Sequence, residues 1–390
     1  MNDNMKRTAR DMLEYNIIPF WKSMRDNVNG GFYGHMDIDL NLDRKADKGC
    51  ILNSRILWFF SEASRILGRD DLLDDARHAF RFLTDYCHDR EHDGIFWSVT
   101  YDGYPSDVTK HTYNQAFAVY ALSAFYEAGR EREALDLANR IFRLIENKCT
   151  DSAGYGEAYD RTFQPVSNDK LSENNVMADK TMNTLLHIFE AYSGLYRAAK
   201  DSDVGEKMRS ILDVFINKIY NPSLRRQEVF FDANWNSIID LTSYGHDIEA
   251  SWLVEWGCRM LGDPLLQEQI EKICSELAAG TYDRAFLENS LRYECEHGVE
   301  NESRSWWVQA EAVVGFLNMA QKHPGQTKYL QAAEDILKFI GDKIIDKRSG
   351  SEWLSEVYPD GSHTEAQKPI VEQWKCPYHN GRMCFEILTR

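Results

Sequence analysis

Long apolar runs and paired cysteines are both missing from this chain of 390 residues. No uninterrupted apolar segment approaches the roughly 20 residues that a membrane-spanning helix needs, and the start, MNDNMKRTARDML, has no apolar signal core. The eight cysteines form no CxxC pair and no spacing typical of zinc ligands. These absences predict a cytoplasmic protein with reduced, mostly structural thiols and no membrane partner.

Positive charge is also scarce. The 45 Lys and Arg residues are outnumbered by 62 Asp and Glu residues, so the formal net charge is −17. An acidic surface repels the phosphates of nucleic acids and the headgroups of anionic lipids. Hydrophobic residues make up 43% of the chain, which is enough for a substantial core. We therefore expect a soluble globular protein that does not bind nucleic acid.

No Pro- or Ser-rich linker divides the chain, whereas a segment rich in glycine and aromatic residues recurs six times. Each segment is typical of a β-hairpin. The six are NGGFYGHMDIDLN from Asn29, DGIFWSVTYDGYP from Asp93, AGYGEAYDRTFQPV from Ala153, EVFFDANWNS from Glu228, NSLRYECEHG from Asn289 and SGSEWLSEVYPDGS from Ser349. This regular order predicts a single domain over residues 1–390.

Two kinds of helix alternate with these hairpins. Apolar, aromatic-rich inner helices are predicted to start near Leu52, Lys110, Ala178, His246, Arg304 and Pro377. Amphipathic outer helices are predicted over Asp3–Met24, Asp70–Tyr86, Glu131–Asn147, Asp203–Ile219, Pro264–Ala279 and Lys328–Lys343. Only the connections from outer to inner helices are long, so the hairpins gather on one face. Six such units bury their apolar faces by closing into a ring. The predicted fold is all-α, an (α/α)6 barrel of twelve helices with short β-hairpins in the long loops at one face.

The start of each inner helix is the expected place for function, because helix N-termini offer free N–H groups and positive potential. The first turns of these helices hold Arg55, Tyr113, Asn183, His187, His246, Glu249, Trp307, Glu311 and His379, with Trp374 just upstream of the last helix. His246 and Glu249 are three residues apart and two further pairs are four apart, so partners share a helix face. Buried polar groups cost free energy unless they are hydrogen-bonded or used. The cluster therefore predicts a functional site.

Each candidate also has a purely structural explanation. A single histidine on an apolar helix is more often a satisfied core residue, and Arg55 could pair with a neighbouring carboxylate. Trp307 and Trp374 could be barrel packing. Three histidines at equivalent starts of repeat units favour function for the set as a whole.

The glutamates favour a supporting role. Glu249 and Glu311 could hold an arginine or a histidine in place rather than take part in the chemistry. The His246-x-x-Glu249 spacing resembles half of a metal site, but no second HxxH or carboxylate cluster completes it in the sequence. We therefore expect no bound metal.

The segments SYGHDIEASWL, WWVQAEAVVGF and WKCPYHNGRMC, with essentially the whole chain, resemble the cellobiose 2-epimerase branch of the N-acylglucosamine 2-epimerase family. The resemblance implies an (α/α)6 barrel, a reaction without metal or cofactor, and a β-1,4-linked disaccharide such as cellobiose or lactose as substrate. It implies that His246 and His379 form the acid/base pair. It also implies that Arg55 and His187 lie around O1 and O2 of the sugar. Three residues match the supporting polar residues of the family: Asn183, Glu249 and Glu311. Three others match the positions that line the sugar site: Tyr113, Trp307 and Trp374. The sequence has no Gly-rich phosphate loop for the nucleotide effector of the N-acetylglucosamine relatives.

The implied chemistry accounts for these residue types. Inverting C2 of an aldose removes a proton next to the aldehyde and returns one on the opposite face, so two acid/base groups are needed. Histidine has an ordinary pKa of about 6.5, which leaves both forms available near neutrality. Negative charge builds on O1 in the enediolate, and a preorganised cation such as Arg55 would stabilise it. Glu249 could fix the tautomer of a neighbouring histidine.

Four other functions stay open at this point. A glycoside hydrolase would need two opposed carboxylates, whereas the inner-helix starts are rich in His and Arg. An aldose–ketose isomerase would use the same enediolate and return the proton to C1, and a mannose or glucose 2-epimerase would differ in substrate. A non-catalytic sugar-binding protein would explain the tryptophans but not the histidines. The sequence does not rank the disaccharides. It leaves the oligomeric state unknown, with a monomer slightly favoured.

Overall fold

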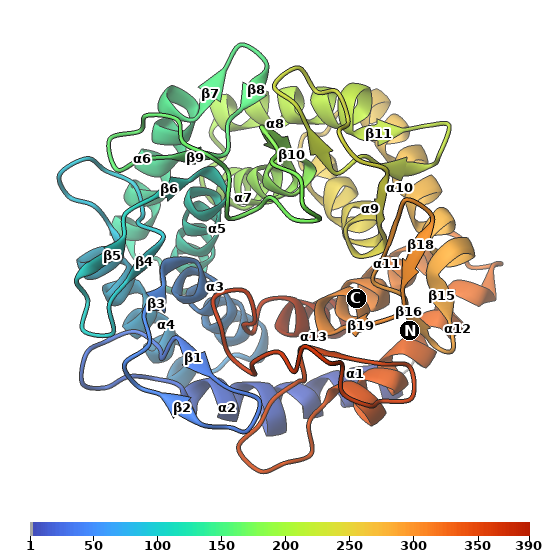
Figure 1. Ribbon diagram of the computed structural model, residues 1–390, viewed down its shortest axis with the longest axis horizontal. Helices are drawn as coiled ribbons and strands as arrows, with labels where there is room; N and C mark the ends of the chain where they lie inside the picture. Colours follow the sequence, from blue (N-terminus) through green and yellow to red (C-terminus); the bar gives the residue numbers. More distant parts are fainter. Residues whose placement is uncertain (1–2) are drawn as a thin grey trace.

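The computed structural model describes residues 3–390 as a closed double ring of helices (Figure 1). The inner ring consists of α3 (Cys50–Leu67), α5 (Thr112–Gly129), α7 (Met182–Ala199), α9 (Tyr244–Arg259), α11 (Trp306–Lys322) and α13 (His379–Thr389). Each inner helix packs against the next, and α13 returns to α3.

The outer ring starts with α1 (Asp3–Met12), the π-helical turn η1 (Leu13–Ile17) and α2 (Ile18–Ser23), which form one continuous helix. It continues with α4 (Asp70–Phe82) and η2 (Leu83–Cys87), α6 (Arg132–Lys148), α8 (Ser202–Val214) and η3 (Phe215–Ile219), α10 (Pro264–Ala285), and α12 (Thr327–Phe339) and η4 (Ile340–Ile344). Over residues 3–390 these segments make twelve helices, which confirms the predicted (α/α)6 barrel.

The two rings differ in burial as their sequences predict. Helix α3 is buried at every position from Cys50 to Ser64, because outer helices cover one side and the other inner helices the opposite side. Helix α6 buries only one stripe, at three- and four-residue spacing from Ala134 to Ile145. The apolar core is therefore continuous around the barrel between the two rings.

The predicted hairpins are present, but the strands also pair between units. Five strands that lead into inner helices pair antiparallel with the following unit: β3 (Lys48–Gly49) with β4 (Ser98–Val99), β6 (Lys110–His111) with β9 (Ala158–Tyr159), β10 (Lys180–Thr181) with β13 (Phe230–Phe231), β14 (Leu241–Ser243) with β17 (Glu294–Glu296), and β19 (Arg304–Ser305) with β20 (Glu356–Val357). A bridge between Met36 and Val371 joins the first unit to the last. A belt of short strands therefore encircles the rim.

The remaining strands lie within single units. They are β1 (His35–Met36), β2 (Leu42–Asp43), β5 (Pro105–Asp107), β7 (Thr150–Asp151), β8 (Gly154–Tyr155), β11 (Tyr220–Asn221), β12 (Arg226–Gln227), β15 (Phe286–Leu287), β16 (Ser290–Leu291) and β18 (Val299–Asn301). Figure 1 shows these strands and the long loops over one face of the barrel.

Ion pairs, three of them buried on both sides and one with a half-exposed aspartate, anchor the rim to the inner helices. A lysine just before an inner helix reaches an acidic side chain at the start of a hairpin: Lys48 to Asp26 at 2.7 Å, Lys110 to Asp89 at 3.1 Å, Lys180 to Asp151 at 2.8 Å, and Lys375 to Glu352. Removing one partner of such a buried pair costs about 3–5 kcal/mol. The loops around the mouth are therefore held in place by repeated ion pairs.

The helices and the cysteines of the barrel bear on membrane contact and on disulfide formation. Across residues 3–390, no helix has both the length and the apolar character that a membrane span requires. All eight cysteines are free thiols, and each is buried except Cys295, which is partly exposed.

Candidate active site

The first turns of the inner helices surround a cavity of about 250 Å³ at the rim face. Nine of the ten predicted site residues line it: Arg55, Tyr113, Asn183, His187, His246, Glu249, Trp307, Trp374 and His379. The tenth, Glu311, lies behind His379. The structure therefore brings the predicted residues together, with Glu311 as a partner of a histidine rather than as part of the cavity wall.

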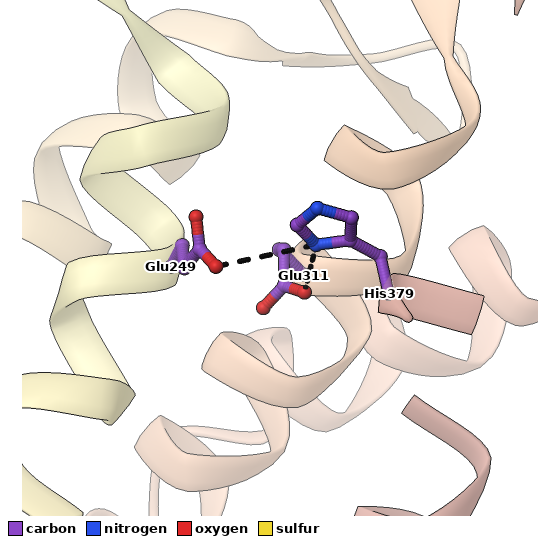
Figure 2. Close-up of side chains that lie close together, drawn as sticks. All are labelled: Glu249, Glu311 and His379. Carbon is purple, nitrogen blue, oxygen red and sulfur yellow. Dashed lines mark hydrogen bonds and ion pairs between the residues drawn. The ribbon is translucent and has the colours of Figure 1, made fainter. Parts of the chain in front are cut away.

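His379 begins α13 and is held from behind by carboxylates (Figure 2). Its Nδ1 lies 2.8 Å from Oε1 of Glu311 and 4.0 Å from Oε1 of Glu249. A carboxylate at Nδ1 fixes the proton there and leaves Nε2 as the basic nitrogen. Burial holds the pKa of His379 well below its ordinary value, and the charge of Arg382 adds to this effect. The histidine is therefore neutral in the free protein at neutral pH.

Arg382, one turn after His379, is the shared cation of this network. Its guanidinium donates to Glu190 at 2.5 Å, to Glu311 at 2.6 Å, and to Glu249. Burial and the neighbouring charge of Glu311 raise the pKa of Glu249 to about 7. Behind His379, Glu249 therefore takes up a proton near neutral pH.

His246 has a different environment. Its Nδ1 lies 2.7 Å from Oγ of Ser243, and its ring packs against Trp307 with 4.8 Å between centroids. The ring of His379 packs against the same indole at 5.5 Å. Burial, with a smaller effect of His187, lowers the pKa of His246 to about 3. Both histidines are thus neutral at pH 7, whereas the ordinary histidine pKa had suggested a mixture of forms.

His187 is the third histidine at the cavity. Its Nδ1 lies 2.8 Å from Glu190 of the same helix, and its ring sits 5.1 Å from Tyr113 and 4.9 Å from Phe117. One turn earlier, the side-chain oxygen of Asn183 is buried without a hydrogen-bond partner. Asn183 and His187 therefore both present polar atoms to the cavity from α7.

Arg55 is a buried cation that has no carboxylate partner among residues 3–390. Its guanidinium donates to the hydroxyl of Tyr113 at 2.8 Å and to the backbone oxygen of Trp374 at 3.4 Å. It also lies 4.1 Å from the ring centroid of Phe117. Among residues 3–390 no carboxylate oxygen comes within 4.0 Å of it, so the alternative of a salt bridge fails. A buried unpaired cation attracts negative charge that develops in the cavity.

The two predicted tryptophans are both partly exposed at the cavity rather than enclosed in the core. Trp374 packs edge-on against Trp97 at 5.6 Å and Tyr113 at 5.9 Å. Trp307 lies between the two histidines and Tyr293. Flat aromatic faces therefore border the site on more than one side.

The donors around His379 also have the composition of a metal site. One ligand atom each from Glu249, Glu311 and His379 lies within 4.8 Å of the others. The guanidinium of Arg382 is bonded to both carboxylates and already supplies the positive charge there. A divalent cation would have to displace Arg382, so this arrangement disfavours a metal.

Sequence reasoning missed four residues of this site: Glu190, Ser243, Tyr378 and Arg382. Arg382 follows His379 by three residues and Glu190 follows His187 by three. The same spacing rule that linked His246 with Glu249 would have found both. Tyr378 donates to Glu190 at 2.6 Å, an interaction between α13 and α7 that no local spacing indicates.

The chain is similar in sequence and in structure to known proteins. The family model described as N-acylglucosamine 2-epimerase (GlcNAc 2-epimerase) matches residues 31–379. A cellobiose 2-epimerase of Eubacterium cellulosolvens is 52% identical over 388 residues, covering 95% of each chain. A cellobiose 2-epimerase of Ruminococcus albus is 47% identical over 382 residues, covering 98% of this chain and 97% of the relative. The solved structure of a cellobiose 2-epimerase from Bacillus thermoamylovorans has a TM-score of 0.96 at 41% identity, covering 100% of both chains. The chain therefore belongs to the N-acylglucosamine 2-epimerase family and is an enzyme of the isomerase class.

Proposed function

We propose that this protein is a cellobiose 2-epimerase, formed by one catalytic domain over residues 1–390. It inverts C2 of the reducing-end glucose in β-1,4-linked disaccharides, converting cellobiose to glucosyl-mannose and lactose to epilactose. One observation carries the proposal: two neutral imidazoles, His246 and His379, pack on one indole beside a cavity that also holds the unpaired cation Arg55. The relatives named above support the choice of substrate.

The reaction starts with ring opening, because only the open-chain aldehyde makes the hydrogen on C2 acidic. Opening moves the proton of the O1 hydroxyl to the ring oxygen, and an imidazole can accept and return it. One neutral imidazole then removes hydrogen from C2 as a proton. The electron pair of that bond moves into the C1–C2 bond, and the carbonyl pair moves to O1. Since burial keeps both His246 and His379 neutral, each is in the form that acts as a base.

The enediolate carries its negative charge on O1, where Arg55 is the available cation. The guanidinium is oriented in advance by Tyr113 and by the backbone at Trp374, so it does not have to reorganise as charge develops. His187, held at Nδ1 by Glu190, donates a hydrogen bond from its other nitrogen when that nitrogen carries the proton.

The second histidine returns a proton to the opposite face of C2, which restores the aldehyde with inverted configuration. That histidine must carry a proton at this stage. In the tautomer with its proton on Nε2, His379 can give that proton to C2 while Nδ1 takes up the proton that Glu249, 4.0 Å away, holds near neutral pH. After turnover, the extra proton on the first histidine exchanges with water. The side-chain oxygens of Asn183 and Glu249 that have no hydrogen-bond partner can accept hydrogen bonds from sugar hydroxyls.

Product analysis with purified protein and cellobiose tests the proposal. Glucosyl-mannose is the expected product, and in deuterated water its C2 should carry solvent deuterium. Glucosyl-fructose would identify an aldose–ketose isomerase, free glucose a hydrolase, and unchanged cellobiose a binding protein. A product without solvent deuterium would contradict the histidine mechanism.

A further inference from the structure

We propose that Ser243 is a positioning residue for His246, holding the imidazole by Nδ1 so that Nε2 faces the cavity. The inference rests on the proposed function. It concerns the only one of the three cavity histidines in residues 3–390 whose Nδ1 partner is a hydroxyl group rather than a carboxylate.

Ser243 does not use its side chain to cap its helix. Ser243 is the N-cap of α9, and a serine there normally accepts a hydrogen bond from a backbone N–H of the first turn. Its side chain makes no such bond and instead lies 2.7 Å from Nδ1 of His246. At the equivalent start of α7, Thr181 does cap its helix, through the N–H of Thr184 at 3.0 Å. The difference indicates that the hydroxyl at Ser243 serves the histidine.

Ser243 is itself held in place by a strand. Its backbone belongs to β14, which pairs with β17 and places Ser243 opposite Glu294. The ring of Trp307 also packs against the His246 ring, with 4.8 Å between centroids. A methyl group added at Gly245 would come 2.4 Å from the Trp307 ring, so the strand, the helix start and the indole are tightly packed. The imidazole is therefore held between a hydroxyl group and an aromatic face.

A hydroxyl group and a carboxylate affect a neighbouring imidazole differently. A hydroxyl can accept from Nδ1–H without adding charge, and in that tautomer it orients the ring and leaves the basic lone pair on Nε2. A carboxylate at that place, like the carboxylate of Glu311 beside Nδ1 of His379, would also stabilise the imidazolium form. Ser243 therefore holds His246 in a reactive orientation while leaving it free to give up the proton that it takes.

The test compares Ser243→Ala, Ser243→Thr and wild type on cellobiose, with kcat and KM measured separately. Loss of the hydroxyl should lower kcat about 10-fold or more, a part of the ~10²–10⁴-fold that positioned acid/base groups contribute. KM should stay within about twofold, and the Thr variant, which restores the hydroxyl, should recover most of kcat. Because Ser243 does not cap α9, its Ala variant should keep the fold and the circular dichroism spectrum of wild type.

Asp201→Ala is the matched control, since Asp201 is the N-cap of the outer helix α8 and accepts from the N–H of Asp203. It should lower Tm and leave kcat unchanged. A Ser243→Ala variant with kcat within twofold of wild type would overturn the inference, as would equal losses in the Ala and Thr variants. If wild type does not epimerise cellobiose at all, the proposed function fails, whereas a failure confined to the Ser243 variants refutes only the positioning role.

Discussion

Replacing Arg382 by Met tests whether one guanidinium holds the network behind His379 together. Arg382 donates to Glu190, Glu249 and Glu311, and all four side chains are buried. Methionine fills much of the space of the arginine stem, so the lost charge dominates the effect. The substitution leaves three carboxyl groups inside the barrel without their common partner.

The magnitude follows from the burial of this network. Removing one partner of a buried ion pair costs about 3–5 kcal/mol. At an unfolding entropy of about 2.1 cal/mol/K per residue, a chain of 390 residues has about 0.8 kcal/mol/K. The ratio predicts that the Arg382→Met variant melts about 4–6 °C below wild type where the carboxyl groups are ionised.

The pH dependence has a definite sign. The pKa of Glu249 is about 7 in the folded protein, because burial and Glu311 raise it, against about 4.3 in an unfolded chain. The folded state therefore binds more protons between these values, and stability falls as pH rises across them. Without Arg382 the folded pKa rises further. The loss of Tm should consequently be smaller at pH 5 than at pH 8.

Thermal unfolding followed by circular dichroism at both pH values measures this difference. Arg390→Met is the control, because Arg390 ends the same helix and pairs at 3.0 Å with Glu386 at the barrel end. A partly exposed pair contributes about 0–1 kcal/mol, so the control should shift Tm by about 1 °C or less. An Arg382→Met loss that equals the control, or that is the same at pH 5 and pH 8, would refute the reasoning.

Four further predictions concern the reaction. His246→Ala and His379→Ala should each lower kcat on cellobiose at least ~100-fold with an unchanged circular dichroism spectrum; near-normal turnover would remove that histidine from the mechanism. Arg55→Met should lower kcat about 10²–10³-fold, because the enediolate loses its cation; an effect on KM alone would contradict this role. Trp374→Ala and Trp307→Ala should each weaken cellobiose binding by about 1–3 kcal/mol, because apolar contact with the sugar is lost. If a ring contacts only the distal sugar, its loss should leave turnover of mannose or glucose unchanged. Thorough chelation should leave activity unchanged. A loss of activity that one divalent ion restores would mean that a metal, rather than Arg55, stabilises the enediolate.

Much of the fold could be predicted because the information is local. The stripe in α6 and the uniform apolarity of α3 are periodicities within single helices, and the glycine-rich hairpins separate them. The strand belt could not be predicted, since its strands are two or three residues long and pair across units. The pairing of Lys48 with Val99 joins segments that no short pattern connects.

The site divides in the same way. Residues at inner-helix starts could be predicted to meet, because ring closure brings equivalent positions to one mouth. Which carboxylate holds which histidine could not, because that depends on how helices cross. Glu249 shares a helix with His246 but bonds to Arg382 of α13, and Glu311 of α11 reaches His379.

Positive and negative charges lie on different sides of the cavity, and this asymmetry favours one orientation of the bound sugar. On one side, Arg55 is a cation without a carboxylate partner among residues 3–390. Behind His379, three carboxyl groups share the single cation Arg382, so negative charge is in excess there. An enediolate oxygen is stabilised near Arg55, whereas a proton or an imidazolium is stabilised beside the carboxyl groups. The reacting sugar should therefore bind with O1 toward Arg55 and C2 within reach of His379.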